Sequence, residues 1–198
     1  LSLTINDAMA KYLTQSYPVG QVMALRGLSI ILLLIAFLFF MNNLRALKIF
    51  SWKGHLLRAG AMTGSTFFFI TGLSLLPITD AIAIAFVAPI LTTILGVIIL
   101  REAVSWKRWA AIFVGFFGVI IILQPTSDAF KIAAIAPMGA AAFGAARDVI
   151  TRAISGSENS LSILFTSMLM ITIAGFLTYP LGWSAVKLSH IWIFITSS

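Results

Sequence analysis

The sequence predicts an all-α integral membrane protein, a polytopic helix bundle with short connections. Two observations lead to this fold class. Hydrophobic residues make up 60% of the 198 residues, and charged residues only 10%, against roughly 25% in soluble proteins. The hydrophobic residues also form long runs, and a water-soluble chain of this length would have no polar surface left to cover them.

The individual helices follow from the length of each apolar run. A spanning helix needs about 20 mostly apolar residues. Six stretches meet this requirement: 19–41, 55–76, 79–100, 106–123, 131–154 and 161–182. Partial helices are expected at 1–17 and 188–198, which gives about eight helices in all. We expect the chain to be a fragment of a longer protein, truncated slightly at the front and more at the back.

The connections and small residues predict how these helices pack. The breaks are short and rich in turn formers, so consecutive helices should be antiparallel neighbours. Pro89 lies in the middle of 79–100, where it removes a backbone hydrogen bond and frees the carbonyl of Ala85; this predicts a kink. Thr79 or Asp80 is expected to cap the start of that helix. Close packing is predicted by small-residue segments at 60–64, 115–118 and 133–146.

The net charge of +7 arises from 13 basic and 6 acidic residues. The basic residues lie in the breaks between apolar runs, so we interpret them as topology signals and expect no nucleic-acid partner. With the first helix running outward from the cytoplasm, four basic residues lie outside: Lys11, Arg26, Lys131 and Lys187. The other nine lie inside: Arg45, Lys48, Lys53, Arg58, Arg101, Lys107, Arg108, Arg147 and Arg152. The sequence thus predicts a multi-pass protein of the cell (inner) membrane with a cytoplasmic N-terminus.

Two acid–base pairs occur at the same spacing in different parts of the chain. Asp7 and Lys11 are four residues apart, and so are Asp148 and Arg152, 141 positions later. Five helices separate the two pairs, and an odd number inverts the second copy relative to the first. This pattern is typical of the inverted repeats of secondary transporters. The alternative is that each pair only stabilises its own helix, as such spacing does in any helix.

The candidate substrate-pathway residues are Asp7, Lys11, Arg26, Pro89 and Asp148, since ionisable groups inside a membrane are costly and usually functional. Asp7 is either neutralised by Lys11 or faces a central cavity as a substrate or proton site. Arg26 has no acid three or four residues away. It either extends to the outer interface or binds an anionic group of the substrate or the carboxylate of another helix. Pro89 is either a packing kink or a substrate contact. The position that matches Arg26 in the second copy is Ser167.

Enzyme chemistry is not expected from this sequence. No HExxH, GxSxG or phosphate-binding loop motif occurs, cysteine is absent, and the only histidines are His55 and His190. We therefore expect no catalytic residues, no cofactor and no metal site. Because no ATPase motif occurs either, transport would be driven by a gradient.

Several segments resemble a known family: "NDAMAKYL", "YPVGQVMALRG", "LSLLPITDAIAIAFVAPILTTILGVIILRE" and "WKRWAAIFVGFFGVIIILQP". They resemble proteins of the drug/metabolite transporter superfamily with paired EamA-type domains. Residues 1–125 correspond to the first domain and 128–198 to the start of the second. The resemblance implies inverted five-helix repeats, ten helices in the intact protein, around a central cavity, and alternating access for small organic metabolites. The most similar branches are those assigned to S-adenosylmethionine or riboflavin uptake; export of amino acids or drugs is also within the superfamily.

The function expected from these observations is secondary transport, with a small-molecule substrate, the lipid bilayer and a second copy of the chain as partners. The alternative is a membrane structural or accessory subunit without transport activity. A cavity lined by Asp7, Arg26 and the Pro89 region would favour transport, and a solid bundle would favour the subunit.

Overall fold

The computed structural model describes residues 2–42, 47–49, 51–123, 132–156 and 159–196. Within these ranges the chain is helical and contains no strand. The α-helices are α1 (Ser2–Thr14), α2 (Val19–Phe40), α3 (Trp52–Leu75), α4 (Ile78–Ala85), α5 (Ala88–Leu100), α6 (Trp106–Leu123), α7 (Ile135–Ile154), α8 (Ser160–Phe176) and α9 (Leu188–Thr196). Short 3-10 helices at Ile132–Ala134 and Tyr179–Leu181 adjoin α7 and α8. The expected domain boundary at 125–128 and the predicted topology residues Arg45 and Lys131 lie outside the described ranges.

Among the described residues, four helical stretches are long and apolar enough to cross a membrane. They are Val19–Phe40, Ile78–Leu100, Ile132–Ile154 and Ser160–Leu181. At 1.5 Å per residue, the 22 residues of α2 extend about 33 Å, which matches a hydrocarbon core of about 30 Å. Many large apolar side chains are exposed, such as Phe40 and Ile98, as contact with lipid requires. The predicted fold class, a polytopic helical membrane protein, is confirmed, although α3 and α6 are not among these four stretches.

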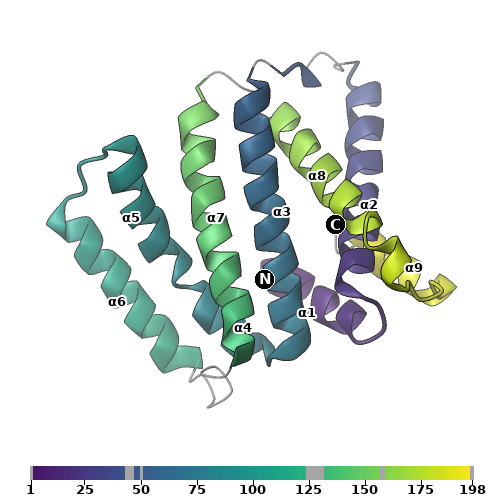
Figure 1. Ribbon diagram of the computed structural model, residues 1–198, viewed down its shortest axis with the longest axis horizontal. Coiled ribbons are helices and arrows are strands. Elements are labelled where there is room, and N and C mark those ends of the chain that lie inside the picture. The colour runs from purple at the N-terminus through teal and green to yellow at the C-terminus, as the bar shows by residue number, and fades with distance from the viewer. Residues whose placement is uncertain (1, 43–46, 50, 124–131, 157–158, 197–198) are drawn as a thin grey trace.

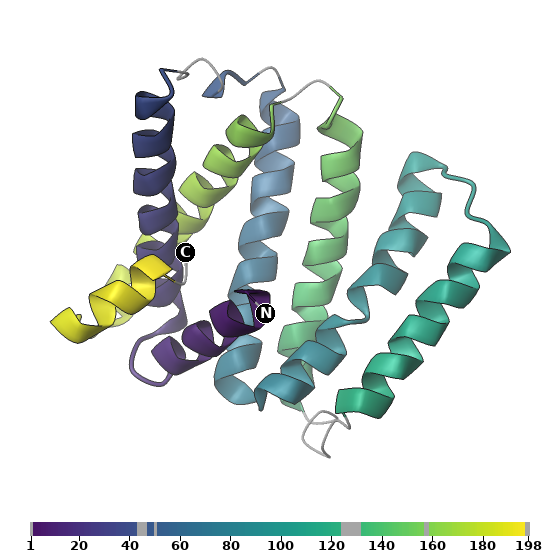
Figure 2. The same ribbon diagram turned by 180° about the vertical axis from the view of Figure 1, so that it is seen from behind.

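The long helices stand side by side around α3 (Figures 1 and 2). α3 packs against α7 on one side and α8 on the other, α2 packs against α8, and α5 packs against α7. The largest cluster of buried apolar side chains joins α1, α2, α3, α8 and α9, with Leu13, Val22, Ile70, Met168 and Phe194 among its members. The core thus lies between helices of the N-terminal part of the chain, α1 to α3, and helices of its C-terminal part, α8 and α9.

α2 and α8 run in opposite directions and cross closely. α2 begins at the end of the molecule where α1 ends, and α8 begins at the opposite end, where α7 ends (Figures 1 and 2). At the crossing, a Cβ atom added to Gly175 would lie 2.6 Å from the backbone nitrogen of Ala24 and 2.7 Å from the carbonyl oxygen of Gly20. Glycine is therefore required at position 175 for this approach of the two backbones.

The small-residue segments predicted to pack closely do so only in part. Gly64 lies against Phe143 and Gly139 against Phe68. No described atom lies within 4 Å of a Cβ placed at Gly60, Gly115 or Gly118. The prediction of tight packing is therefore wrong at these three glycines, because the faces they occupy are turned away from the neighbouring helices.

The helix predicted at 79–100 is broken near its middle. α4 ends at Ala85, α5 begins at Ala88, and Pro89 lies in the first turn of α5. The kink predicted from Pro89 is confirmed. The capping prediction is wrong, because the N-cap of α4 is Pro77 and makes no side-chain hydrogen bond. Asp80 instead lies in the first turn of α4 and is fully buried.

Candidate functional site

Arg26 lies two turns into α2 and faces the polar residues of α1. Its Nη2 donates a 2.7 Å hydrogen bond to Oδ1 of Asn6, and its guanidinium attracts the carboxylate of the next residue, Asp7. The polar turn at 15–18 folds α1 back toward α2, which makes this contact possible. In the structure Arg26 contacts polar groups of another helix, which is one of the interpretations that the sequence left open for this residue. Asp7 and Arg26, both predicted site residues, thus lie together.

Arg26 also lines a cavity of about 130 Å³ between α2, α3 and α8, which we call the Arg26 cavity. Its other lining residues are Met23, Gly27, Ile30, Met62, Thr66, Ile70, Met168 and Ile171. Three of these are methionines, whose flexible, polarisable side chains adapt to ligands of irregular shape. The cavity therefore combines one cation with an adaptable apolar wall inside the helix bundle.

Lys11 binds the end of α3. Its Nζ donates hydrogen bonds to the carbonyl oxygens of Leu73, at 2.8 Å, and Leu76, at 2.6 Å. The last carbonyls of a helix lack partners within the helix and carry partial negative charge, so a lysine there is favourable. Lys11 thereby fastens α1 to the C-terminal end of α3.

Pro89 and Asp148, two further predicted site residues, line a different cavity. This Pro89 cavity has a volume of about 340 Å³ and lies between α5, α6 and α7. Arg108, Thr92 and Thr93 also line it. Oδ1 of Asp148 accepts hydrogen bonds from Nε and Nη2 of Arg147, at 2.8 and 2.6 Å. Of the five predicted site residues, Arg26 thus lines one cavity and Pro89 and Asp148 line another, whereas Asp7 and Lys11 are not among the lining residues of either.

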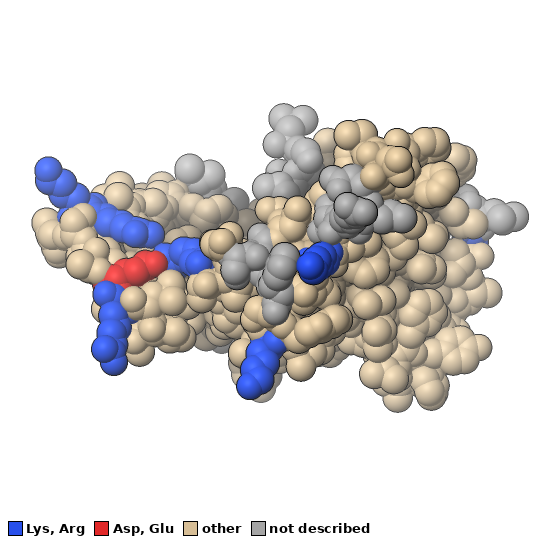
Figure 3. All heavy atoms as spheres, turned by 90° about the horizontal axis from the view of Figure 1, so that it is seen from above, with Lys and Arg blue, Asp and Glu red and all other residues tan. Residues whose placement is uncertain are grey.

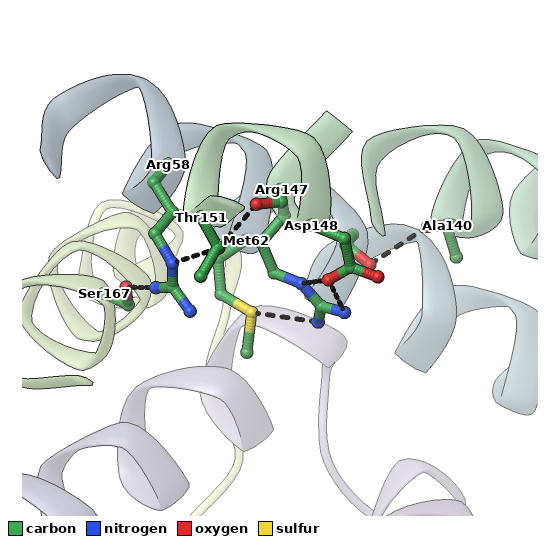
Figure 4. A network of polar contacts seen from close by, with 8 residues as sticks. Arg58, Met62, Ala140, Arg147, Asp148, Thr151 and Ser167 are labelled. Atoms are coloured by element: carbon green, nitrogen blue, oxygen red, sulfur yellow. Dashed lines mark hydrogen bonds and ion pairs between the residues drawn. The ribbon is translucent and has the colours of Figure 1, made fainter. Parts of the chain in front are cut away.

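The sequence analysis missed a polar network around Arg58 of α3 (Figure 4). Nε of Arg58 donates to Oγ1 of Thr151 on α7 at 2.7 Å, and Nη1 donates to Oγ of Ser167 on α8. Nη1 is also 3.5 Å from the carbonyl oxygen of Ile163. One guanidinium thus joins three helices. Sequence reasoning had counted Arg58 only as a topology signal.

Arg58 lines a third cavity, of about 300 Å³, between α3, α7 and α8, which we call the Arg58 cavity. The other residues around it are Thr151, Ser155, Ser160, Ile163 and Leu164. A signal for this site was present in the sequence, because Arg58, Met62, Thr66 and Ile70 recur every four residues and so share one helix face. The same face of α3 therefore meets both the Arg58 cavity and the Arg26 cavity.

A second ion pair fixes α5 to α7. Nη1 of Arg152 lies 2.8 Å from Oε2 of Glu102, and Nη2 reaches the carbonyl oxygen of Thr92 at 3.3 Å. α5 ends at Leu100, and its C-cap residue, Arg101, has a left-handed conformation with φ of 54°. This turn places Glu102 beside α7. The pair is partly exposed, so its role is to hold the two helices together rather than to supply much free energy.

Basic side chains gather at the end of the molecule where α7 ends and α8 begins, and acidic side chains are scarce there (Figure 3). The exposed basic residues near this end include Lys53, Arg101, Lys107 and Arg108. The Arg58 cavity lies toward this end, because Ser155 and Ser160 flank the connection between α7 and α8. Within the described ranges, no three His, Asp or Glu side chains come together in a group that could hold a metal ion.

The sequence of this chain is similar to those of known transporters. The EamA-like transporter family matches residues 1–124. The S-adenosylmethionine uptake transporter of Rickettsia prowazekii is 31% identical over 84% of this chain and 56% of its own length. That of Rickettsia bellii is 33% identical over 87% and 59%. The riboflavin transporter of Vibrio cholerae is 31% identical over 60% of this chain and 40% of its own length.

The chain spans less than three fifths of the length of these relatives. A crystal structure of another protein superposes on 99% of this chain and 70% of that one, with a TM-score of 0.76 and 16% identity. A likeness at this identity shows the fold alone. The family match covers most of the chain, and the chain belongs to the EamA-like transporter family.

Proposed function

We propose that this EamA-like chain forms part of a secondary transporter that moves a small organic metabolite across the membrane by alternating access. The observation that carries the proposal is the Arg26 cavity, in which a guanidinium lines a space between α2, α3 and α8. A cation inside a membrane bundle is costly unless a substrate, an ion or a partner group uses it. Asn6 and Asp7 beside Arg26 hold it in position in the absence of substrate.

The relation between the two ends of the chain supports alternating access. α2 begins at Val19 and α8 at Ser160, which is the same 141-residue offset that relates Asp7 to Asp148. The two helices run in opposite directions and pack against each other (Figures 1 and 2). We infer inverted repeats, 1–125 and the start of a second at 128–198, with a two-fold axis in the membrane plane near the α2–α8 crossing. Such repeats can rock against each other around a site near the middle of the membrane.

The substrate that best suits the cavity is one with a carboxylate. S-adenosylmethionine carries an α-amino-acid group, whereas riboflavin has no carboxylate. A guanidinium binds a carboxylate with two parallel, charge-assisted hydrogen bonds, so Arg26 favours an S-adenosylmethionine-like substrate. Uptake of a riboflavin-like compound is the second choice, and export of amino acids or drugs the third.

The proposal also covers the orientation of the protein in the membrane, its assembly and its lack of enzyme activity. The basic end seen in Figure 3 faces the cytoplasm, because positively charged segments stay on the inner side of the cell membrane. With this orientation α1 runs toward the outer end of the bundle (Figure 1), and we infer a cytoplasmic N-terminus. The protein acts as a transporter without enzyme activity, and a second copy of the chain is a candidate partner.

Uptake into proteoliposomes tests this function. The full-length protein should take up radiolabelled S-adenosylmethionine saturably, and riboflavin more weakly. Arg26→Gln should reduce uptake by about tenfold or more, since a hydrogen bond to a charged group contributes about 1.5–3 kcal/mol. Arg26→Lys should retain a fraction of the uptake, because lysine keeps the positive charge but lacks the planar guanidinium group. Lys53→Gln, which removes an exposed charge of α3, is the matched control and should have no effect.

Normal uptake by Arg26→Gln would remove Arg26 from the pathway. The alternative function is a membrane accessory subunit without transport activity. It is favoured by one observation, that Arg58, Arg147 and Arg152 all bind groups of the chain itself, as packing residues would. A correctly folded full-length protein that takes up no candidate metabolite would support this alternative.

A further inference from the structure

We propose that the Arg58 cavity is a second binding site for the anionic group of the substrate, a carboxylate, reached after the Arg26 cavity on the way through the bundle. The proposal rests on the transport function proposed above. It assigns Arg58 a direct contact with the substrate in addition to its contacts with α7 and α8.

The lining of the cavity suits an oxyanion. Among the described residues that line it, Arg58 is the only charged one. The hydroxyl groups of Thr151 and Ser155 donate to the carbonyl oxygens of Arg147 and Arg152, and Ser160 contributes a third hydroxyl group to the wall. A guanidinium binds a carboxylate with charge-assisted, often bidentate hydrogen bonds, and a serine hydroxyl group can donate one more. The cavity also adjoins the first residue of α8, Ser160, where helix N–H groups favour negative charge.

The hydrogen bonds of Arg58 orient its guanidinium without neutralising it. Oγ1 of Thr151 donates to the carbonyl of Arg147 at 2.6 Å, and Oγ of Ser167 donates to the carbonyl of Ile163 at 2.7 Å. Both hydroxyl oxygens therefore accept from Arg58, as Figure 4 shows. Among the described residues, the hydrogen-bond partners of Arg58 are thus neutral oxygens, and they fix the plane of the fork between two helices.

Among the described residues, the charges that act on Arg58 leave an excess of one positive charge. Arg58 and Arg147 repel each other, and both are attracted to one carboxylate, Asp148. Arg147 binds that carboxylate directly through two nitrogen atoms, at 2.6 and 2.8 Å. A partly buried charge without its own counter-ion is costly, so an anion that enters the cavity would relieve this imbalance.

The face of α3 connects this cavity to the Arg26 cavity. Met62 follows Arg58 by one turn, about 6 Å along the helix axis, and it lines the Arg26 cavity. Its Sδ also lies 3.5 Å from Nη1 of Arg147. On α8, Met168 of the Arg26 cavity directly follows Ser167, which binds Arg58. Two flexible methionines therefore separate the two guanidiniums, and their movement would let an anionic group pass from Arg26 to Arg58.

Cysteine protection tests the second site directly, because residues 1–198 contain no cysteine; any cysteine elsewhere in the full-length protein is first replaced by serine. Ser155→Cys places a single thiol in the wall of the Arg58 cavity. Its reaction with a charged thiol reagent is measured in the full-length protein with S-adenosylmethionine, or with 5′-methylthioadenosine, which lacks the amino-acid group. At ten times its dissociation constant, S-adenosylmethionine should slow the reaction by about tenfold, and 5′-methylthioadenosine should not. Ser74→Cys, an exposed serine near the other end of α3, is the control and should not be protected.

Variants of Arg58 then identify the group responsible. In the Ser155→Cys background, Arg58→Gln should raise the ligand concentration needed for protection by about 10- to 100-fold. Arg58→Lys should raise this concentration less, and Lys53→Gln should leave it unchanged. Equal protection by both compounds would overturn the assignment of the anionic group. Absence of protection in a protein that still takes up S-adenosylmethionine would overturn the second site while the proposed function stands. Absence of all uptake would overturn the proposed function. If Arg58→Gln fails to fold, the comparison of the two compounds with Arg58 intact still decides.

Discussion

The crossing of α2 and α8 depends on Gly175, and Gly175→Ala should destabilise the protein. An added Cβ would lie 2.6 Å from the nitrogen of Ala24 and 2.7 Å from the oxygen of Gly20. Both are backbone atoms of α2, so no side-chain rotation can relieve the clash. The two helices must move apart instead, and contacts around the Arg26 cavity would loosen, because Gly27 and Met168 of the same two helices line it.

The magnitude follows from two opposing effects. Overpacking of a close contact costs about 1–3 kcal/mol. Alanine is more favourable than glycine inside a helix by about 0.5–1 kcal/mol, which offsets part of this cost. The expected net loss for Gly175→Ala is therefore between about 0 and 2.5 kcal/mol, with a central value of about 1 kcal/mol. The matched control is Gly60→Ala in α3, where no described atom lies within 4 Å of the added Cβ; it should be neutral or stabilising by up to about 1 kcal/mol.

Reversible unfolding of the purified protein in mixed micelles, followed by circular dichroism, measures both variants under the same conditions. Uptake by Gly175→Ala should fall together with its stability. If Gly175→Ala is as stable as Gly60→Ala, the close approach of α2 and α8 is not a feature of the protein in the membrane, and the packing described around the Arg26 cavity would be wrong.

Three further changes probe other contacts. Lys11→Met should cost about 2 kcal/mol, because two hydrogen bonds from a charged group to the end of α3 are lost; a loss below about 0.5 kcal/mol in the same unfolding assay would contradict this role. Glu102→Gln should cost less than about 1 kcal/mol, since its pair with Arg152 is partly exposed, and a larger loss in that assay would show a buried pair. A cysteine at position 107, introduced as Lys107→Cys, should react with an impermeant reagent only from the cytoplasmic side, and labelling of intact cells would reverse the proposed orientation.

The sequence by itself determined the class of protein and its helices. Long apolar runs and polar breaks are local properties, readable within about 20 residues, and within the described ranges each predicted span is mostly helical, with 79–100 divided into α4 and α5. The break before Pro89 was equally local, because a proline removes a hydrogen bond wherever its helix lies. The resemblance to the EamA-type transporters was likewise readable from short segments, and the family match over residues 1–124 confirms the family.

Only the tertiary structure decided which side chains meet. Lys11 binds carbonyls 62 and 65 residues away, and Arg58 binds hydroxyl groups 93 and 109 residues away. Spacing along one helix suggested instead that Lys11 would pair with Asp7. Three of the five predicted site residues also divide between two cavities, with Arg26 in one and Pro89 and Asp148 in the other. The physical reason is that hydropathy specifies which segments enter the membrane, whereas polar side chains inside it bind whatever groups the docking of distant helices brings within reach.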